Sequence, residues 1–237
     1  MRKKGFSAVE TMISLALFLM IVMAVFEVFG LARGFFLKIK KGEEETQAAM
    51  AALDKMRIDL LQAGSGLSQA IRLGIIEGIK MSEESLTILN LQETLLLSED
   101  LAPGTQRIIL GAAAAISPGR EICLINAQRG ERRSVLSCKG KVIVLASPLE
   151  FFYRKKETQV LLVETISLYL DKGRSTIRRQ VNLSSPQPLL EDVYSFDFGF
   201  DAKNNLARVN FVLKANEEKT YELLVFPKNI ALSLRRS

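Results

Sequence analysis

The sequence predicts an α+β fold in which one long N-terminal helix precedes an antiparallel β-sheet head and packs on it. Two observations carry this prediction. An apolar run near the N-terminus continues into a segment with helical spacing of apolar residues that ends at Ala63. Beyond Gly66, short segments rich in β-branched and aromatic residues alternate with turn residues. A chain of 237 residues is long enough to bury such a core.

The composition excludes several classes of function. The chain contains no histidine, which rules out Ser-His-Asp catalysis, Cys-His catalysis and histidine-ligated metals. It also lacks the glycine-rich phosphate loop, the dinucleotide fingerprint and the serine-nucleophile motifs. The net charge of +6 includes the three cations of residues 2–4, so the remainder is too nearly balanced to indicate nucleic-acid binding. We therefore expect no enzymatic activity, no cofactor and no bound metal.

The N-terminal segment is predicted to span a membrane. Residues 11–32 contain one charged side chain, Glu27, and as a helix they would be about 33 Å long, close to the thickness of a hydrocarbon core. The basic residues 2–4 precede this span. Because a basic flank stays in the cytoplasm, we expect a cytoplasmic N-terminus and a head on the opposite side of the membrane.

Three interpretations of this segment compete. A cleaved secretory signal needs a shorter apolar region and a small-residue cleavage site, which residues 34–38 (GFFLK) do not supply. A plain signal anchor explains the length and the basic flank, but it leaves Glu10 unexplained. A carboxylate within a bilayer costs about 2.5–3.5 kcal/mol, so Glu10 is a candidate functional group.

The third interpretation accounts for Glu10. Residues 3–10 (KKGFSAVE), followed by the apolar run, resemble the class III signal of type IV prepilins and pseudopilins. The resemblance rests on a basic leader, a Gly-Phe junction, a glutamate at a fixed offset and an apolar helix beyond it. It implies that a prepilin peptidase/methyltransferase cuts after Gly5 and N-methylates Phe6. It also implies that Glu10 guides assembly by pairing with the amino terminus of a neighbouring subunit.

The same resemblance implies the organisation and partners of the chain. It divides the sequence into a leader peptide (1–5), a transmembrane and assembly helix (6–32), an amphipathic continuation (33–63) and a β-rich periplasmic head (64–237), the lollipop shape of pilins. The implied partners are other pilin or pseudopilin subunits and an inner-membrane assembly platform. The head is similar in pattern to PilW-like or J-type minor pilins. Glu27 stands where major pilins often carry proline, which disfavours a main-filament role.

The helix beyond the span is expected to be amphipathic. Its apolar residues recur at helical spacing, and Asp54, Lys55, Arg57 and Asp59 lie on the opposite face. The apolar stripe consists of Ala49, Leu53, Met56, Leu60 and Ala63. The strands are expected at 70–76, 86–91, 107–110, 121–126, 134–145, 160–170, 176–183, 193–200, 207–213 and 221–226.

An aromatic stripe marks the strand predicted at 193–200. Tyr194, Phe196, Phe198 and Phe200 alternate with smaller or polar residues, so they share one face of the strand. Such a stripe can act as a stacking platform for bases or sugars. No lysine or arginine is interleaved with these aromatic residues, so we expect them to pack in the core against the long helix.

The two cysteines are equally distant from a polar turn centred on Gly130 and Glu131. If the flanking strands form a hairpin there, Cys123 and Cys138 lie directly opposite each other and within disulfide range. Because the expected compartment is oxidising, the sequence favours a structural disulfide, with two buried free thiols as the alternative.

Two further patterns bear on ligands. Asp201, Asn204 and Asn205, with Asp197, offer closely spaced oxygen ligands for calcium, although the same residue types favour an ordinary β-turn. Basic clusters at 129–133, 154–156 and 174–179 would have to converge in space to bind DNA. The sequence thus predicts a filament subunit. The alternative is a membrane-anchored binding module that captures DNA or a secreted substrate.

Overall fold

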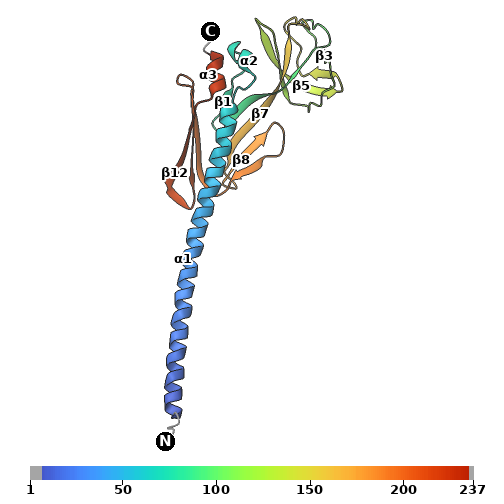
Figure 1. Cartoon of the computed structure of the whole chain (residues 1–237). Helices are drawn as coiled ribbons and strands as arrows, with labels where there is room; N and C mark the ends of the chain where they lie inside the picture. The colour runs from blue at the N-terminus through green and yellow to red at the C-terminus, as the bar shows by residue number, and fades with distance from the viewer. Residues whose placement is uncertain (1–6, 235–237) are drawn as a thin grey trace. The chain divides into compact units, whose positions relative to one another are not determined.

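The computed structural model describes residues 7–234. The chain divides into two units, Met1–Met50 and Ala51–Ser237. The first unit is formed by most of the long helix α1 (Ala8–Gln62), and the second by the end of α1 and the β-rich head (Figure 1). The sequence prediction of an α+β chain with one long N-terminal helix is therefore confirmed.

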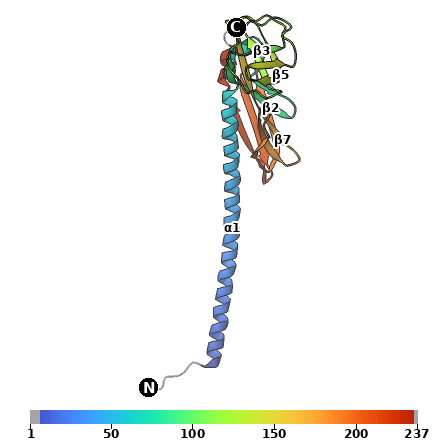
Figure 2. The ribbon, with the colours of Figure 1, turned by 90° about the vertical axis from the view of Figure 1, so that its right-hand side faces the viewer.

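Within the first unit, α1 runs without interruption from Ala8 through Met50 (Figure 2). The large apolar side chains between Val9 and Ile39 are mostly more than half exposed. This helix is long and apolar enough to cross a membrane, and the protein buries none of its most apolar stretch of 18 residues. An apolar surface of this size is stable in lipid or against other helices, and not in water.

Two antiparallel sheets form the head in the described part of the chain. The larger sheet contains β1 (Ile79–Met81), β2 (Ser85–Leu95), β3 (Arg107–Ile109), β4 (Glu121–Ile125), β5 (Gly130–Lys139), β6 (Val142–Leu145), β7 (Gln159–Asp171), β8 (Thr176–Val181) and β9 (Gln187–Leu190). The smaller sheet contains β10 (Val193–Asp201), β11 (Leu206–Leu213) and β12 (Asn216–Val225). Two short helices, α2 (Ser68–Arg72) and α3 (Lys228–Leu234), complete the head.

Strand β7 organises the larger sheet. It pairs with β2 along one edge. Along the other edge, residues 159–162 pair with β4 and residues 166–171 pair with β8, so these two strands share the edge. Between the two shared sections, the Arg120 guanidinium donates to the Val163 carbonyl at 2.8 Å, and the Asn182 amide donates to the Thr165 carbonyl at 2.6 Å. These bonds satisfy backbone groups that would otherwise be unpaired where the two neighbouring strands diverge.

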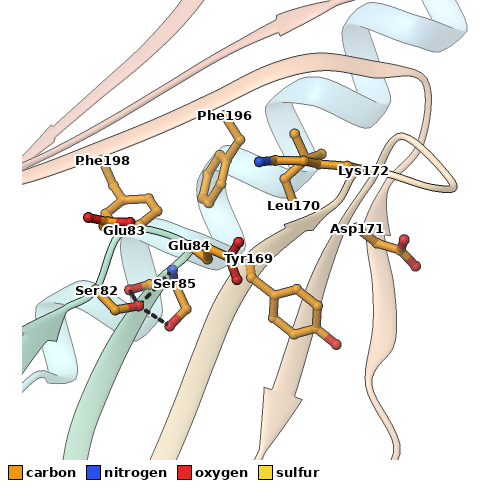
Figure 3. A pocket seen from close by; sticks show the side chains of 10 residues that line it. All are labelled: Ser82, Glu83, Glu84, Ser85, Tyr169, Leu170, Asp171, Lys172, Phe196 and Phe198. Carbon is orange, nitrogen blue, oxygen red and sulfur yellow. Dashed lines mark hydrogen bonds between the residues drawn. The ribbon is translucent and has the colours of Figure 1, made fainter.

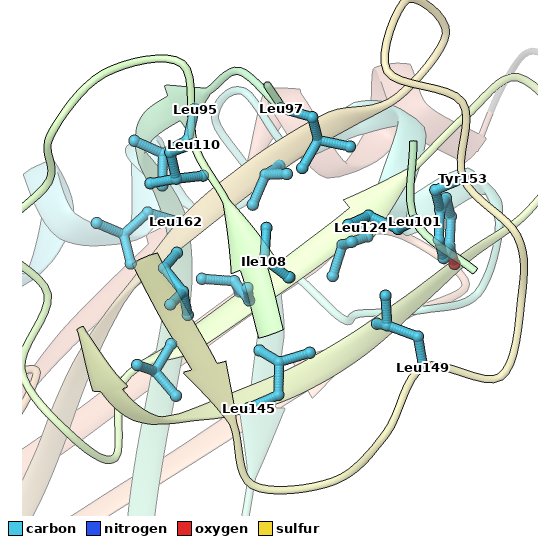
Figure 4. Packing of buried hydrophobic residues seen from close by; sticks show 14 of the residues in the cluster. Leu95, Leu97, Leu101, Ile108, Leu110, Leu124, Leu145, Leu149, Tyr153 and Leu162 are labelled. Carbon is cyan, nitrogen blue, oxygen red and sulfur yellow. The ribbon is translucent and has the colours of Figure 1, made fainter. Parts of the chain in front are cut away.

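A leucine-rich core fills the space beneath β3 to β7 (Figure 4). Tyr153 lies at one end of this core and is fully buried. Ile108 of β3 and Ile143 of β6 are directly opposite each other on these two paired strands. Fully burying a leucine or isoleucine side chain contributes about 1.5–3 kcal/mol, so this cluster is a main source of stability for the head. Its leucines are Leu95, Leu97, Leu101, Leu110, Leu124, Leu145, Leu149 and Leu162.

The end of α1 confirms most of the predicted apolar stripe. Ala52, Met56, Leu60 and Ala63 are at most 1% exposed, whereas Leu53 is half-buried, so the buried face is rotated slightly from the predicted one. Gly64 ends the helix with φ +74, and its amide donates to the Leu89 carbonyl of β2 at 2.9 Å. Glycine adopts this conformation without strain, which explains why the helix stops there.

The strand predicted at 70–76 is wrong, because Ser68–Arg72 forms the helix α2. The apolar residues Leu67, Ala70 and Ile71 are three and four positions apart, and all three are buried. Gly74, with φ +68, then turns the chain toward β1. A segment this short carries too little periodicity to distinguish a helix from a strand.

The single strand predicted at 134–145 is also wrong. Residues 130–145 form a hairpin of β5 and β6, and Gly140 turns the chain with φ +61. The preceding turn falls at 126–129, because the Asn126 side chain accepts bonds from the Gln128 and Arg129 amides. An asparagine bonded in this way stabilises a turn, so the hairpin of β4 and β5 is centred nearer the N-terminus than predicted.

The aromatic stripe of β10 is only partly in the core. Phe196, Phe198 and Phe200 are half-buried, and Tyr194 is 60% exposed. A bulge between Val193 and Ser195 explains the position of Tyr194. The prediction that the stripe is a core face is therefore wrong for Tyr194 and right only in part for the three phenylalanines.

Candidate functional site

The predicted processing site lies at the edge of the described chain. Gly5 and Phe6, the residues of the expected cleavage and N-methylation, are outside the described residues, whereas Glu10 is within them. The structure therefore describes the surroundings of Glu10 alone among the three residues implied by the prepilin resemblance.

Glu10 takes part in a reciprocal cap at the start of α1. Its carboxylate Oε2 accepts the Ser7 amide at 2.9 Å, while the Ser7 hydroxyl accepts the Val9 amide at 3.3 Å. A serine followed three residues later by a glutamate is the signature of a capping box, and here the serine hydroxyl bonds to the amide of Val9 instead of that of Glu10. The cap satisfies two amides that have no partner within the helix. Glu10 thus has a local structural role that the sequence analysis missed, although the spacing of the two residues was sufficient to find it.

The end of α1 is tied to β8 by a buried ion pair. The Arg179 guanidinium donates from Nε to Asp59 Oδ2 at 2.7 Å and from its terminal nitrogen to Oδ1 at 3.0 Å. Asp59 is 1% exposed, and Lys55 lies 3.4 Å from the same carboxylate. The bond to Asp59 raises the pKa of Arg179 above its ordinary value. The placement of Asp59 on the solvent face of the helix is therefore wrong.

The predicted disulfide is wrong, because both cysteines are free. Cys123 of β4 is opposite Arg132, and Cys138 of β5 is opposite Ile143 of β6. The earlier position of the turn separates them in register. Cys123 packs in the cluster with α2, and burial raises its pKa to about 12. Cys138 packs against the leucine-rich core. The alternative of two free thiols fits the structure, with Cys123 buried and Cys138 half-buried.

A second buried carboxylate, Glu131, joins β5 to the chain that follows β6. It is 6% exposed, pairs with Arg133 and accepts the Glu150 amide at 3.0 Å. The Tyr153 hydroxyl is buried beside it, and burial together with Glu131 raises the pKa of Tyr153 above its usual range. This cluster holds the segment after β6 in place.

Five of the nine cations in the basic clusters form ion pairs where they lie. Arg132 and Arg133 pair with Glu121 and Glu131, and Arg154 pairs with Glu157 at 3.2 Å. The arginines of β8 are bound in the same way: Arg178 pairs with Asp171 at 2.8 Å, and Arg179 pairs with Asp59. Because phosphate binding depends on free cations, these pairings do not favour the alternative of DNA capture.

The candidate calcium ligands form a turn between β10 and β11. Asp201 accepts the Lys203 and Asn204 amides at 2.9 and 3.1 Å, and the Asn204 side chain donates to its second oxygen at 2.6 Å. These bonds lower the pKa of Asp201. Asn205 is buried and donates to the Pro227 carbonyl. The acidic residues of the described chain do not gather into a group of three that would hold a metal. The hydrogen bonds of Asp201 are those of an ordinary β-turn.

These features define an α+β protein with a capped N-terminal helix that is long and apolar enough to cross a membrane. No protein-family model matches the sequence, and no curated protein matches it. Among solved structures, a tailspike protein of Pseudomonas phage phi297 is similar over 31% of this chain and 14% of its own length, with 20% sequence identity and a TM-score of 0.28. A match this partial carries no functional argument.

Proposed function

We propose that this chain is a non-enzymatic minor pilin or pseudopilin that assembles into a type IV pilus or a type II secretion pseudopilus. In this proposal, prepilin peptidase removes residues 1–5 and methylates Phe6 in the inner membrane. The observation that carries the proposal is the pattern KKGFSAVE at residues 3–10, joined to a helix whose apolar side chains stay exposed as far as Ile39.

The exposed apolar surface of α1 supports this proposal, because a subunit that assembles from the membrane moves its helix from one apolar environment to another. Lipid would cover it before assembly, and the helices of neighbouring subunits would cover it afterwards. Transfer from lipid to a helix bundle does not expose apolar surface to water, so the hydrophobic effect does not oppose it. The assembly platform would therefore set the direction of movement and the position of each subunit, and the amount of apolar surface exposed to water would not change.

The cap of α1 supports a link between processing and the charge of Glu10. Cleavage after Gly5 would create a cationic amine on Phe6, the residue before Ser7, whose amide already bonds to Glu10. In the membrane, the same carboxylate offsets that amine within one chain. In a water-poor filament, each amine and each carboxylate requires an opposite charge nearby, which a neighbouring subunit would supply.

The second candidate function is a membrane-anchored binding module with the same topology. It would keep the helix in the membrane and use the head to hold a ligand. Two pockets, one lined by Phe196 and Phe198 of β10 and the other by Phe200, favour it for a protein ligand. The paired arginines of β8 do not favour it for DNA. The two functions differ in whether the mature chain leaves the membrane.

Filament fractionation tests the proposal. We expect the mature chain in the sheared-filament fraction of cells with a complete assembly machinery, and in the membrane fraction of matched cells without the assembly ATPase. Immunoblots of both fractions give the ratio. A mature chain that stays in the membrane under both conditions would contradict assembly and favour the anchored binding module.

A further inference from the structure

Two pockets follow one another along β10. The first, which we call the turn pocket, is lined by Phe196 and Phe198 of β10, by the turn at 82–85 and by the β7 end at 169–172 (Figure 3). Its volume is 490 Å³. Hydrogen bonds between Ser82 and Ser85 close this turn, including a 2.8 Å bond between their hydroxyls. The turn pocket thus has a hydrogen-bonded turn on one side and two phenylalanines on another.

The second pocket, the β1 pocket, lies further along β10. Phe200 of β10 and Ala202, which follows that strand, line it together with Ile79 and Met81 of β1. Its volume is 520 Å³, and Ile230 of α3 contributes to its lining. The strands β1 and β10 lie side by side, and the turn at 82–85 directly follows β1, so the two pockets follow one another along β10.

The spacing of the two pockets matches an extended polypeptide. Their centres on β10 fall near residues 197 and 201, which are about 13 Å apart at the rise of a β-strand. A ligand chain that runs extended beside β10 has the same rise per residue. Its side chains at positions i and i+4 would therefore enter the two pockets from the same face of that chain.

The charges of the lining are unequal. Glu83 and Glu84 are exposed and line the turn pocket, and Glu77 lines the β1 pocket. Asp171 also lines the turn pocket, but Arg178 neutralises it at 2.8 Å. Lys172 is the one basic residue among the lining residues of the two pockets. The excess is negative, so it favours a cationic ligand.

We propose that the two pockets together bind an extended segment of another protein, with apolar side chains at positions i and i+4 and a lysine or arginine flanking them. The apolar side chains pack on the half-buried phenylalanines of β10, and the cation lies beside Glu83 and Glu84. The inference rests on the proposed function in one respect, which is that the head is displayed outside the membrane to other proteins. It assigns a role to the aromatic stripe that core packing leaves half-exposed.

Peptide selection on the full-length chain in nanodiscs tests this inference. A displayed library of short linear peptides is selected in parallel against the wild type, the E83K/E84K variant and the E217K/E218K variant. The last is the matched control, because it makes the same charge change at exposed residues of β12 away from both pockets. We expect enriched peptides with an apolar pair four residues apart and a flanking cation.

Those peptides should bind the wild type and E217K/E218K alike, and E83K/E84K at least about tenfold more weakly, which corresponds to 1.4 kcal/mol. Moving the second apolar side chain from i+4 to i+3 should weaken binding further. Enrichment that is equal on all three proteins, or that lacks the apolar spacing, would overturn the inference. A peptide that instead disperses a self-associated chain would assign the pockets to a second copy and would also overturn it. A chain that assembles into filaments but selects no peptides contradicts this inference and leaves the proposed function standing.

Discussion

Replacement of Glu10 by alanine is expected to reduce incorporation into filaments by about 100-fold or more. The neighbouring amine would then lack a counter-charge in a water-poor helix bundle, and breaking a buried pair costs about 3–5 kcal/mol. Membrane insertion and cleavage after Gly5 should persist, because the substitution removes a carboxylate from the span and leaves the Gly-Phe junction intact. The measurement is the ratio of mature chain in the sheared-filament and membrane fractions.

The cap at the start of α1 requires two control variants. Glu10→Gln keeps a capping-box residue but removes the charge, so we expect it to fail in assembly as Glu10→Ala does. Ser7→Ala removes the other half of the cap and keeps the carboxylate, so we expect it to assemble. If Glu10→Gln assembles like the wild type while Ser7→Ala fails, the cap explains Glu10 and the charge does not.

Replacement of Asp59 by alanine is expected to destabilise the head by about 3 kcal/mol. The change leaves the Arg179 guanidinium, which is 19% exposed, without its bidentate partner. We place the loss at the lower end of the range for buried pairs because Arg179 retains some contact with water. The urea midpoint of the full-length chain in detergent should fall by about 1–2 M. The chain has no tryptophan whose fluorescence could report unfolding. Pulse proteolysis is therefore the suitable measurement.

Asp54→Ala is the matched control for Asp59, because Asp54 lies on the same helix and is exposed. We expect it to change stability by less than about 0.5 kcal/mol. Asp59→Asn should fall between the two, since it keeps an acceptor for Arg179 but loses the charge. Equal urea midpoints for Asp59→Ala and Asp54→Ala would show that the ion pair does not hold α1 on β8.

Local patterns predicted much of the fold. The apolar run predicted α1, and Gly64 marked its end. The strands expected at 160–170 and 176–183 correctly separated β7 from β8, and the turn residues Asp201, Asn204 and Asn205 separated β10 from β11. In each case the deciding information lay within a few residues, which is the range that periodicity and turn chemistry cover.

Register was predicted less well. Residues 121–145 could form a turn centred on Gly130 and Glu131 or a turn at 126–129. The hydrogen bonds of the Asn126 side chain stabilise the second. A small displacement of the turn changed every cross-strand pair, which moved Cys123 opposite Arg132 and removed the expected disulfide. Sequence symmetry around Gly130 carried no information about this competition, because register depends on turn geometry and on which face is buried.

The functional residues divide in the same way. The capping box of Ser7 and Glu10 is local and was visible in the sequence. The pair of Asp59 and Arg179 joins residues 120 positions apart, so the charge of Asp59 alone placed it wrongly on the solvent face. Likewise, the half-exposure of Phe196 depends on how the smaller sheet meets the turn at 82–85, which no single segment encodes.

Processing at Gly5 is the central claim, and intact-mass measurement of the mature N-terminus tests it most directly. The chain is expressed with an active prepilin peptidase and, in parallel, with a catalytically inactive one, and the membrane fraction is analysed. We expect a chain without residues 1–5 that begins with N-methyl-Phe6 in the first case, and the uncleaved chain in the second. The peptidase must be shown to process a known prepilin substrate in the same cells. If this chain then still begins at Met1, the prepilin assignment is contradicted.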